Sequence, residues 1–182
     1  SWFQNHYGPN NAVLVLAGDI DTTTARPMVE KMFGDIPPGP GAERLRSWVP
    51  ERVSTTRATM TDAIATPRVS RYWIAPAQSA ADSADLQIAL AILASGSTSR
   101  LYQTLVRDER LAVSVHGGAQ FMETAGISSI SADAAPDVGP ERLETRIGEI
   151  LAEFLKNGPT QDEVDRVAMR AVSGTIRGLE KV

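Results

Sequence analysis

The sequence predicts an α+β fold, in which an antiparallel sheet carries helices packed on one of its faces. Residues 113–121 alternate apolar and polar side chains with a period of two, the pattern of a strand buried on one side. Residues 83–94 contain no helix breaker, and residues 140–157 repeat apolar side chains at helical spacing. Strands that pair in antiparallel fashion, with helices segregated to one face, define this class.

Composition limits the kinds of protein this chain can be. It has 182 residues, of which 42% are hydrophobic, and no cysteine, so disulfides and thiolate zinc sites are excluded. The net charge is −4 and no basic run is present, which argues against a nucleic-acid partner. No apolar run approaches the roughly 18 residues of a membrane span.

We expect residues 1–182 to form a single non-catalytic domain excised from a longer polypeptide. The chain begins at Ser1 without an initiator methionine, and it ends inside a predicted helix. A targeting segment is therefore not expected within it. The compartment stays open, with the bacterial periplasm and the cytoplasm as the two possibilities.

The first part of the chain predicts three strands and one helix. The apolar run at residues 12–17 is typical of a strand covered on both faces. A helix is expected over residues 22–33, capped by Asp21 or Thr22 and ended by Gly34. The Thr-rich residues 54–60 and the aromatic and β-branched residues 69–75 are expected to pair as antiparallel strands.

The second part predicts two helices, two strands and two further helices. The helix over residues 83–94 precedes a unit at 96–121 that contains a tight turn, a short helix and a strand. A strand over 126–134 and a helix over 140–157 follow. The last helix opens with a capping box at Thr160, and these residues are expected to face inward: Val164, Val167, Ala168, Ala171, Val172 and Ile176. The predicted order is β-α-β-β-α-α-β-β-α-α.

The residues themselves offer no catalytic or metal site. His6 and His116 are the only histidines, and no H-x-x-E-H or H-E-x-x-H helix is present to hold zinc. There is no G-x-S-x-G turn for a nucleophile and no glycine-rich phosphate loop. The acidic pairs in GDID and QDEV stand at turns and helix starts, where capping explains them.

Several stretches nevertheless carry a family resemblance. Residues 6–21 (HYGPNNAVLVLAGDID) are similar to the motif Y-x-P-x-N, apolar run, G-D-x-D, and residues 33–37 (FGDIP) continue it. Residues 93–103 (LASGSTSRLYQ) and 111–115 (LAVSV) resemble L-x-G-G-x-x-S-R-L-(F/Y)-Q followed by L-A-Y-S-V. Residues 160–167 resemble the motif T-x-E-E, apolar, x-x-A. In this order the motifs resemble the second, metal-free domain of the pitrilysin/insulinase family of zinc metallopeptidases, which includes the mitochondrial processing peptidases.

The resemblance implies a role in a larger peptidase. In that family a zinc-binding domain with an inverted H-x-x-E-H motif precedes a homologous metal-free domain, and two such pairs close around a peptide. The resemblance therefore implies that this chain holds no cofactor and that zinc is bound by another domain of the parent protein, an N-terminal zinc-binding domain of the same polypeptide. It also implies a homologous partner subunit and a peptide substrate. The chain would wall the chamber and position the peptide.

One departure from the family leaves two hypotheses open. The family often places an Arg and a Tyr near the scissile bond, and the ungapped match puts Val106 and Val113 at these positions. Neither valine can hydrogen-bond a peptide. They fit a zinc-bearing parent endopeptidase whose partner supplies the pair. They fit equally well an inactive, structural or scaffolding subunit with the same fold.

Overall fold

A computed structural model describes residues 2–41, 49 and 51–180 of the chain. Its internal contacts group into two compact units, Ser1–Trp48 and Val49–Val182, which we describe separately. The expectation of one domain over residues 1–182 stays a prediction. Among the described helices, none is both long and apolar enough to cross a membrane.

The first unit is built from short helical segments. It contains α1 (Trp2–His6), the 3-10 helix η1 (Pro9–Asn11) and α2 (Thr22–Phe33). The predicted caps of α2 are confirmed, because the Thr24 N–H donates to Asp21 Oδ1 at 2.8 Å and the helix ends at Gly34. The turn after residue 8 is tied to a later part of the unit, since Asn10 Nδ2 donates to the carbonyls of Gly39 and Pro40.

The strand expected at residues 12–17 is wrong. This segment has no regular secondary structure and belongs to no strand of the described chain, and Val13 is 91% exposed. An extended segment becomes a strand only when a neighbour accepts and donates its backbone hydrogen bonds. The described part of the first unit provides no such neighbour, because it contains no strand.

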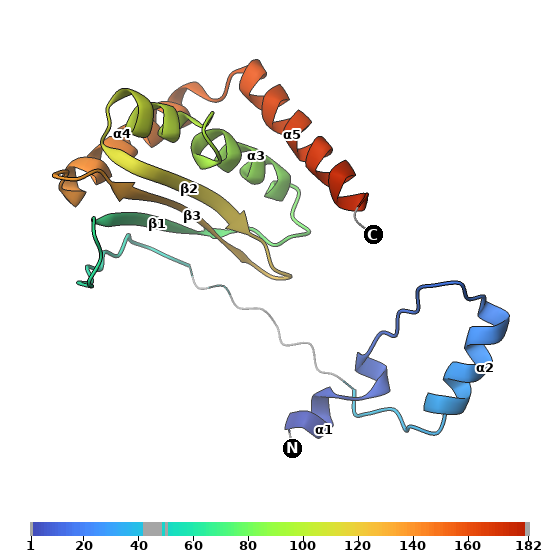
Figure 1. Cartoon of the computed structure of the whole chain (residues 1–182). Helices are drawn as coiled ribbons and strands as arrows, with labels where there is room; N and C mark the ends of the chain where they lie inside the picture. The colour runs from blue at the N-terminus through green and yellow to red at the C-terminus, as the bar shows by residue number, and fades with distance from the viewer. Residues whose placement is uncertain (1, 42–48, 50, 181–182) are drawn as a thin grey trace. The chain divides into compact units, whose positions relative to one another are not determined.

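The second unit carries a three-stranded antiparallel sheet, which confirms the α+β class (Figure 1). Its strands are β1 (Arg68–Ala75), β2 (Ala112–Gln120) and β3 (Gly126–Ala134), in the order β1-β3-β2. The predicted strand at residues 54–60 is wrong, since these residues form no strand, and β1 pairs with β3 instead. β3 offers β1 an unbroken eight-residue register, so the nearest segment in the sequence is not its partner.

The helices of this unit lie on one face of the sheet, as predicted (Figure 1). They are α3 (Ser83–Ala94), the π-helix η2 (Tyr102–Asp108), α4 (Pro140–Asn157) and α5 (Gln161–Leu179). The predicted capping box of α5 is confirmed at Thr160, and Gly158, with φ of 70°, ends α4.

The core lies between these helices and the sheet. Alternate residues of β3 are buried and face the helices. The largest fully buried apolar side chains come from η2 and its preceding turn, from β3 and from α4, and they are Leu101, Leu105, Ile130, Leu143 and Ile147. α3 adds Leu90, Ile92, Leu93 and Ala94 from its C-terminal half. Burial of these side chains is the main stabilising contribution to the unit.

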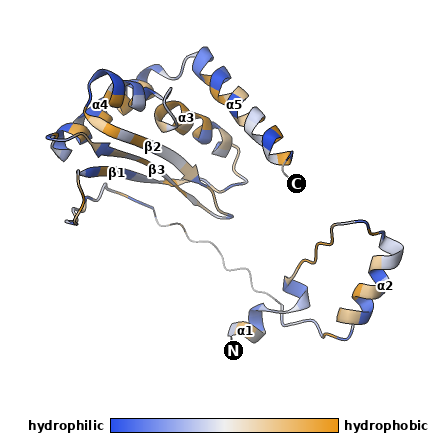
Figure 2. Ribbon diagram, in the orientation of Figure 1, coloured by the Kyte–Doolittle hydropathy of each residue, from blue (hydrophilic) through white to orange (hydrophobic). Residues whose placement is uncertain are grey.

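The apolar side of α5 is only partly buried. Val164, Val167 and Ala168 are half-buried, but Ala171, Val172 and Ile176, which were expected to face inward, are exposed. Figure 2 shows hydrophobic and hydrophilic patches alternating along this helix. The prediction is wrong for the second half of α5 because an amphipathic pattern identifies an apolar face without identifying what covers it.

Two neighbouring glycines in β2 give a test of which face is buried. A Cβ atom added to Gly117 would lie 2.5 Å from the Ala94 Cβ, whereas one added to Gly118 would meet no atom within 4 Å. We expect Gly117→Ala to lower the free energy of unfolding by about 1–3 kcal/mol, because α3 must move away. Gly118→Ala is the matched control and is expected to change it by less than about 0.5 kcal/mol. Urea unfolding of both variants measures this, and equal effects would contradict the assignment of faces.

Candidate functional site

The sheet has a second face that none of the described helices of its unit covers (Figure 1). The strand register identifies its residues, because side chains alternate between the two faces. We call this surface the open face, and it consists of Arg68, Ser70, Tyr72, Ile74, Ser114, His116, Gly118, Gln120, Ile127, Ser129, Ser131 and Asp133.

Polar contacts on the open face cross all three strands. Arg68 Nε donates to Asp133 Oδ1 at 2.6 Å, and Ser114 Oγ donates to Asp133 Oδ2 at 2.6 Å. Hydrogen bonds from Arg68, and then from Ser114, hold the pKa of Asp133 below its usual range. Asp133 is therefore an ionised anchor for both edge strands, not a group that exchanges a proton near neutral pH.

The open face has the composition of a contact surface, not of a catalytic centre. The Ser70 and Ser131 hydroxyls lie 3.0 Å apart, and His116 is paired in register with Ser131. Arg68 and Asp133, which pair with each other, are the only Asp, Glu, Lys or Arg residues among its members. The hydroxyl groups and Tyr72 place hydrogen-bonding groups and apolar area on this surface.

The residues present do not fit a zinc ion. No group of three His, Cys, Asp or Glu side chains able to hold a metal occurs among the described residues. His6, in the first unit, stacks on Trp2 with ring centroids 4.6 Å apart, and its Nδ1 lies 2.8 Å from the Trp2 carbonyl oxygen. His116 belongs to the second unit. The described residues therefore provide no zinc site at which a reaction could take place.

Val113 occupies a β-bulge at the start of β2. The register passes from Ala112 opposite Ala134 directly to Ser114 opposite Asp133, so Val113 is an extra residue on β2. It is 54% exposed, and the expectation that Val113 and Val115 share a buried face is wrong. The bulge lets Ala112 stay buried while Ser114 reaches Asp133.

Val106 lies in the π-helix η2 and is half-buried against the core. The pitrilysin/insulinase family, which this chain resembles, often has an Arg at this position, whereas the isopropyl group of Val106 makes an apolar contact. The role of Val106 and Val113 at the family's Arg and Tyr positions stays a prediction. Both side chains are aliphatic, so neither can donate or accept a hydrogen bond.

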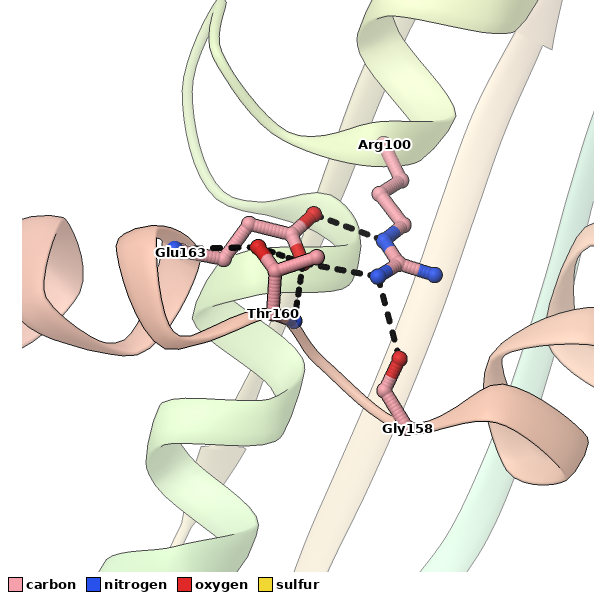
Figure 3. Close-up of polar contacts among 4 residues, drawn as sticks. All are labelled: Arg100, Gly158, Thr160 and Glu163. Carbon is pink, nitrogen blue, oxygen red and sulfur yellow. Dashed lines mark hydrogen bonds and ion pairs between the residues drawn. The ribbon is translucent and has the colours of Figure 1, made fainter.

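Arg100 joins the turn before η2 to the start of α5 (Figure 3). Its Nε and Nη2 atoms donate to the two carboxylate oxygens of Glu163, each at 2.7 Å, and Nη2 also donates to the Gly158 carbonyl at 3.1 Å. The guanidinium carbon lies 5.0 Å from the centre of the Phe154 ring. The pair is largely shielded, with 24% of the Arg100 side chain and 15% of the Glu163 side chain exposed.

Glu163 is held in its ionised form. Hydrogen bonds from Arg100, and further ones from the backbone N–H and hydroxyl of Thr160, lower the pKa of Glu163 to about 2 against the opposing effect of burial. A carboxylate held ionised in this way has no proton to donate near neutral pH and is only a weak general base. The pair is therefore a structural tie between two elements that are distant in the sequence.

The sequence of this chain matches the peptidase M16 inactive domain over residues 1–170. The chain belongs to the peptidase M16 inactive-domain family. This confirms the resemblance to the metal-free second domain of the pitrilysin/insulinase zinc metallopeptidases. No curated protein matches the sequence significantly.

Solved structures similar to this M16 inactive domain include larger proteins. A protease from Helicobacter pylori has 20% identity and a TM-score of 0.76, with 98% of this chain and 44% of that chain covered. The peptidase M16 inactive domain from Pseudomonas fluorescens has 20% identity and a TM-score of 0.69, with 85% and 37% covered. The ferredoxin protease FusC, a mutant in complex with Arabidopsis ferredoxin, has 20% identity and a TM-score of 0.54, with 87% and 17% covered. The chain thus spans less than half the length of each of these proteins.

A hollow on this M16 inactive domain lies near the start of β2. Arg146 dominates it, donating to Glu109 at 2.7–3.0 Å and to Glu149 at 2.8 Å. The Arg146 hydrogen bonds lower the pKa of Glu109. Because the guanidinium of Arg146 is already paired with both of these carboxylates, the hollow presents a solvated ion-pair cluster.

Neither the open face nor the tie made by Arg100 was predicted from the sequence. Arg100 was identified only as part of a family motif, because no sequence pattern indicates that it pairs with Glu163, 63 positions away. The open face had a detectable signal, since residues 126–134 (GISSISADA) place Ser or Asp at alternate positions after Ile127. This alternation indicates a strand with one polar side, but it does not indicate which strands lie beside it.

The Arg100–Glu163 pair predicts how stability depends on pH. Because the folded-state pKa of Glu163 is about 2 and its ordinary value is 4.5, the stability that the pair provides is present above the ordinary pKa and is lost as the pH falls toward 2. We expect Glu163→Gln to lower the free energy of unfolding at neutral pH by about 2 kcal/mol.

Between about pH 6 and pH 3, the unmodified chain should lose roughly 1–2 kcal/mol more stability than the Glu163→Gln variant. Asp162→Asn is the matched control, because Asp162 is exposed and makes no ion pair with the described residues. Denaturant unfolding at a series of pH values measures the difference. Parallel pH profiles for the unmodified chain and Glu163→Gln would show that the pair does not contribute.

Proposed function

We propose that this M16 inactive domain forms a wall of the chamber of a zinc-dependent endopeptidase and positions the peptide substrate there. A separate N-terminal domain of the same polypeptide would carry the H-x-x-E-H zinc site, and a homologous partner subunit would complete the chamber. The observation that carries the proposal is the open face, a polar sheet surface without a covering helix among the described elements of its unit.

The physical properties of the open face suit this role. Contacts between Arg68, Asp133 and Ser114 connect side chains of the three strands and would restrain the surface. A rigid wall can orient an extended peptide and exclude water without taking part in bond cleavage. The many hydroxyl groups can satisfy the peptide's polar groups, which an apolar wall would leave unpaired.

The edge of the sheet supports the same proposal. β2 is nine residues long, pairs only with β3 among the described strands, and contains no Pro, Lys or Arg. Natural proteins protect free edges with such residues, because a free edge pairs with other extended chains. An extended peptide added alongside β2 would gain backbone hydrogen bonds regardless of its sequence.

The two aliphatic residues also favour a second candidate. With Val106 and Val113 at the family's Arg and Tyr positions, this domain supplies no polar side chain there. In an active enzyme a homologous partner subunit would have to supply both groups. The alternative is that the parent protein is an inactive structural or scaffolding subunit with this fold.

The chemistry of the chain predicts its behaviour toward zinc. Purified alone, the chain should hold far less than one equivalent of zinc after dialysis and should cleave no peptide, because two isolated imidazoles bind the ion weakly. Elemental analysis and a peptide-cleavage assay measure both properties. One tightly bound equivalent of zinc would contradict the prediction.

The two candidate functions differ in the full-length parent protein. We expect the parent to contain zinc and to cleave peptides only when mixed with a homologous partner subunit. Zinc content and cleavage are measured for the parent alone, for the partner alone and for the mixture. A stable complex without zinc and without cleavage would overturn the proposal and favour the structural subunit.

A substitution on the open face tests substrate positioning. Tyr72 is 67% exposed on this face, so Tyr72→Ala should leave the fold intact. We expect it to raise KM for peptide cleavage by the active complex about 3- to 10-fold with little change in kcat, since one aromatic contact contributes about 0.5–1.5 kcal/mol.

The matched control is Leu155→Ala, because Leu155 is 82% exposed on α4. It should leave both constants unchanged. An unchanged KM in Tyr72→Ala would contradict a role of the open face in binding peptide. An equal rise in both variants would attribute the effect to general destabilisation.

A further inference from the structure

We draw no further inference here: the strongest candidate, the exposed apolar stripe of Met169, Val172, Ile176 and Leu179 on α5, carries no proposal because nothing in the described part of the structure shows what covers it.

Discussion

Close packing of α3 against one face of the sheet is the constraint on which the second unit depends. Ala94 is fully buried at the end of this helix, and only a glycine at position 117 leaves room for it on β2. Apolar side chains from η2, β3 and α4 complete the same core. Since the helices occupy one face, the alternation of the strands places the polar residues together on the other.

Within the family motif at residues 93–103, the residues 99–101 mainly stabilise the fold. Ser99 is buried and its hydroxyl donates to the Gly96 carbonyl, Leu101 is fully buried, and Arg100 makes the tie to Glu163. These residues fix how the chain turns from α3 into η2 and where α5 begins. Such a motif can persist in a domain without catalytic groups, because it specifies the fold and not a reaction.

The proposed role separates the positioning of the peptide from its hydrolysis. A surface that positions an extended peptide needs rigidity and hydrogen-bonding groups, whereas hydrolysis needs a metal-bound or activated water. The open face carries hydrogen-bonding groups and side-chain contacts between its strands, and the described residues of this chain include no metal-binding group. The bulge at Val113 contributes to this surface, since it aligns Ser114 with Asp133 on the open face.

The sequence alone determined the local structure of this protein: the helices at 22–33, 83–94 and 140–157, the start of the last helix after Thr160, the caps at Asp21 and Thr160, and the family motifs. These depend on neighbours within a few residues, so their signals lie in short segments. The tertiary structure alone decided that β1 pairs with β3, that residues 12–17 and 54–60 form no strand, and that Arg100 meets Glu163. Strand pairing and ion pairs join distant residues, and periodicity carries no information about the partner.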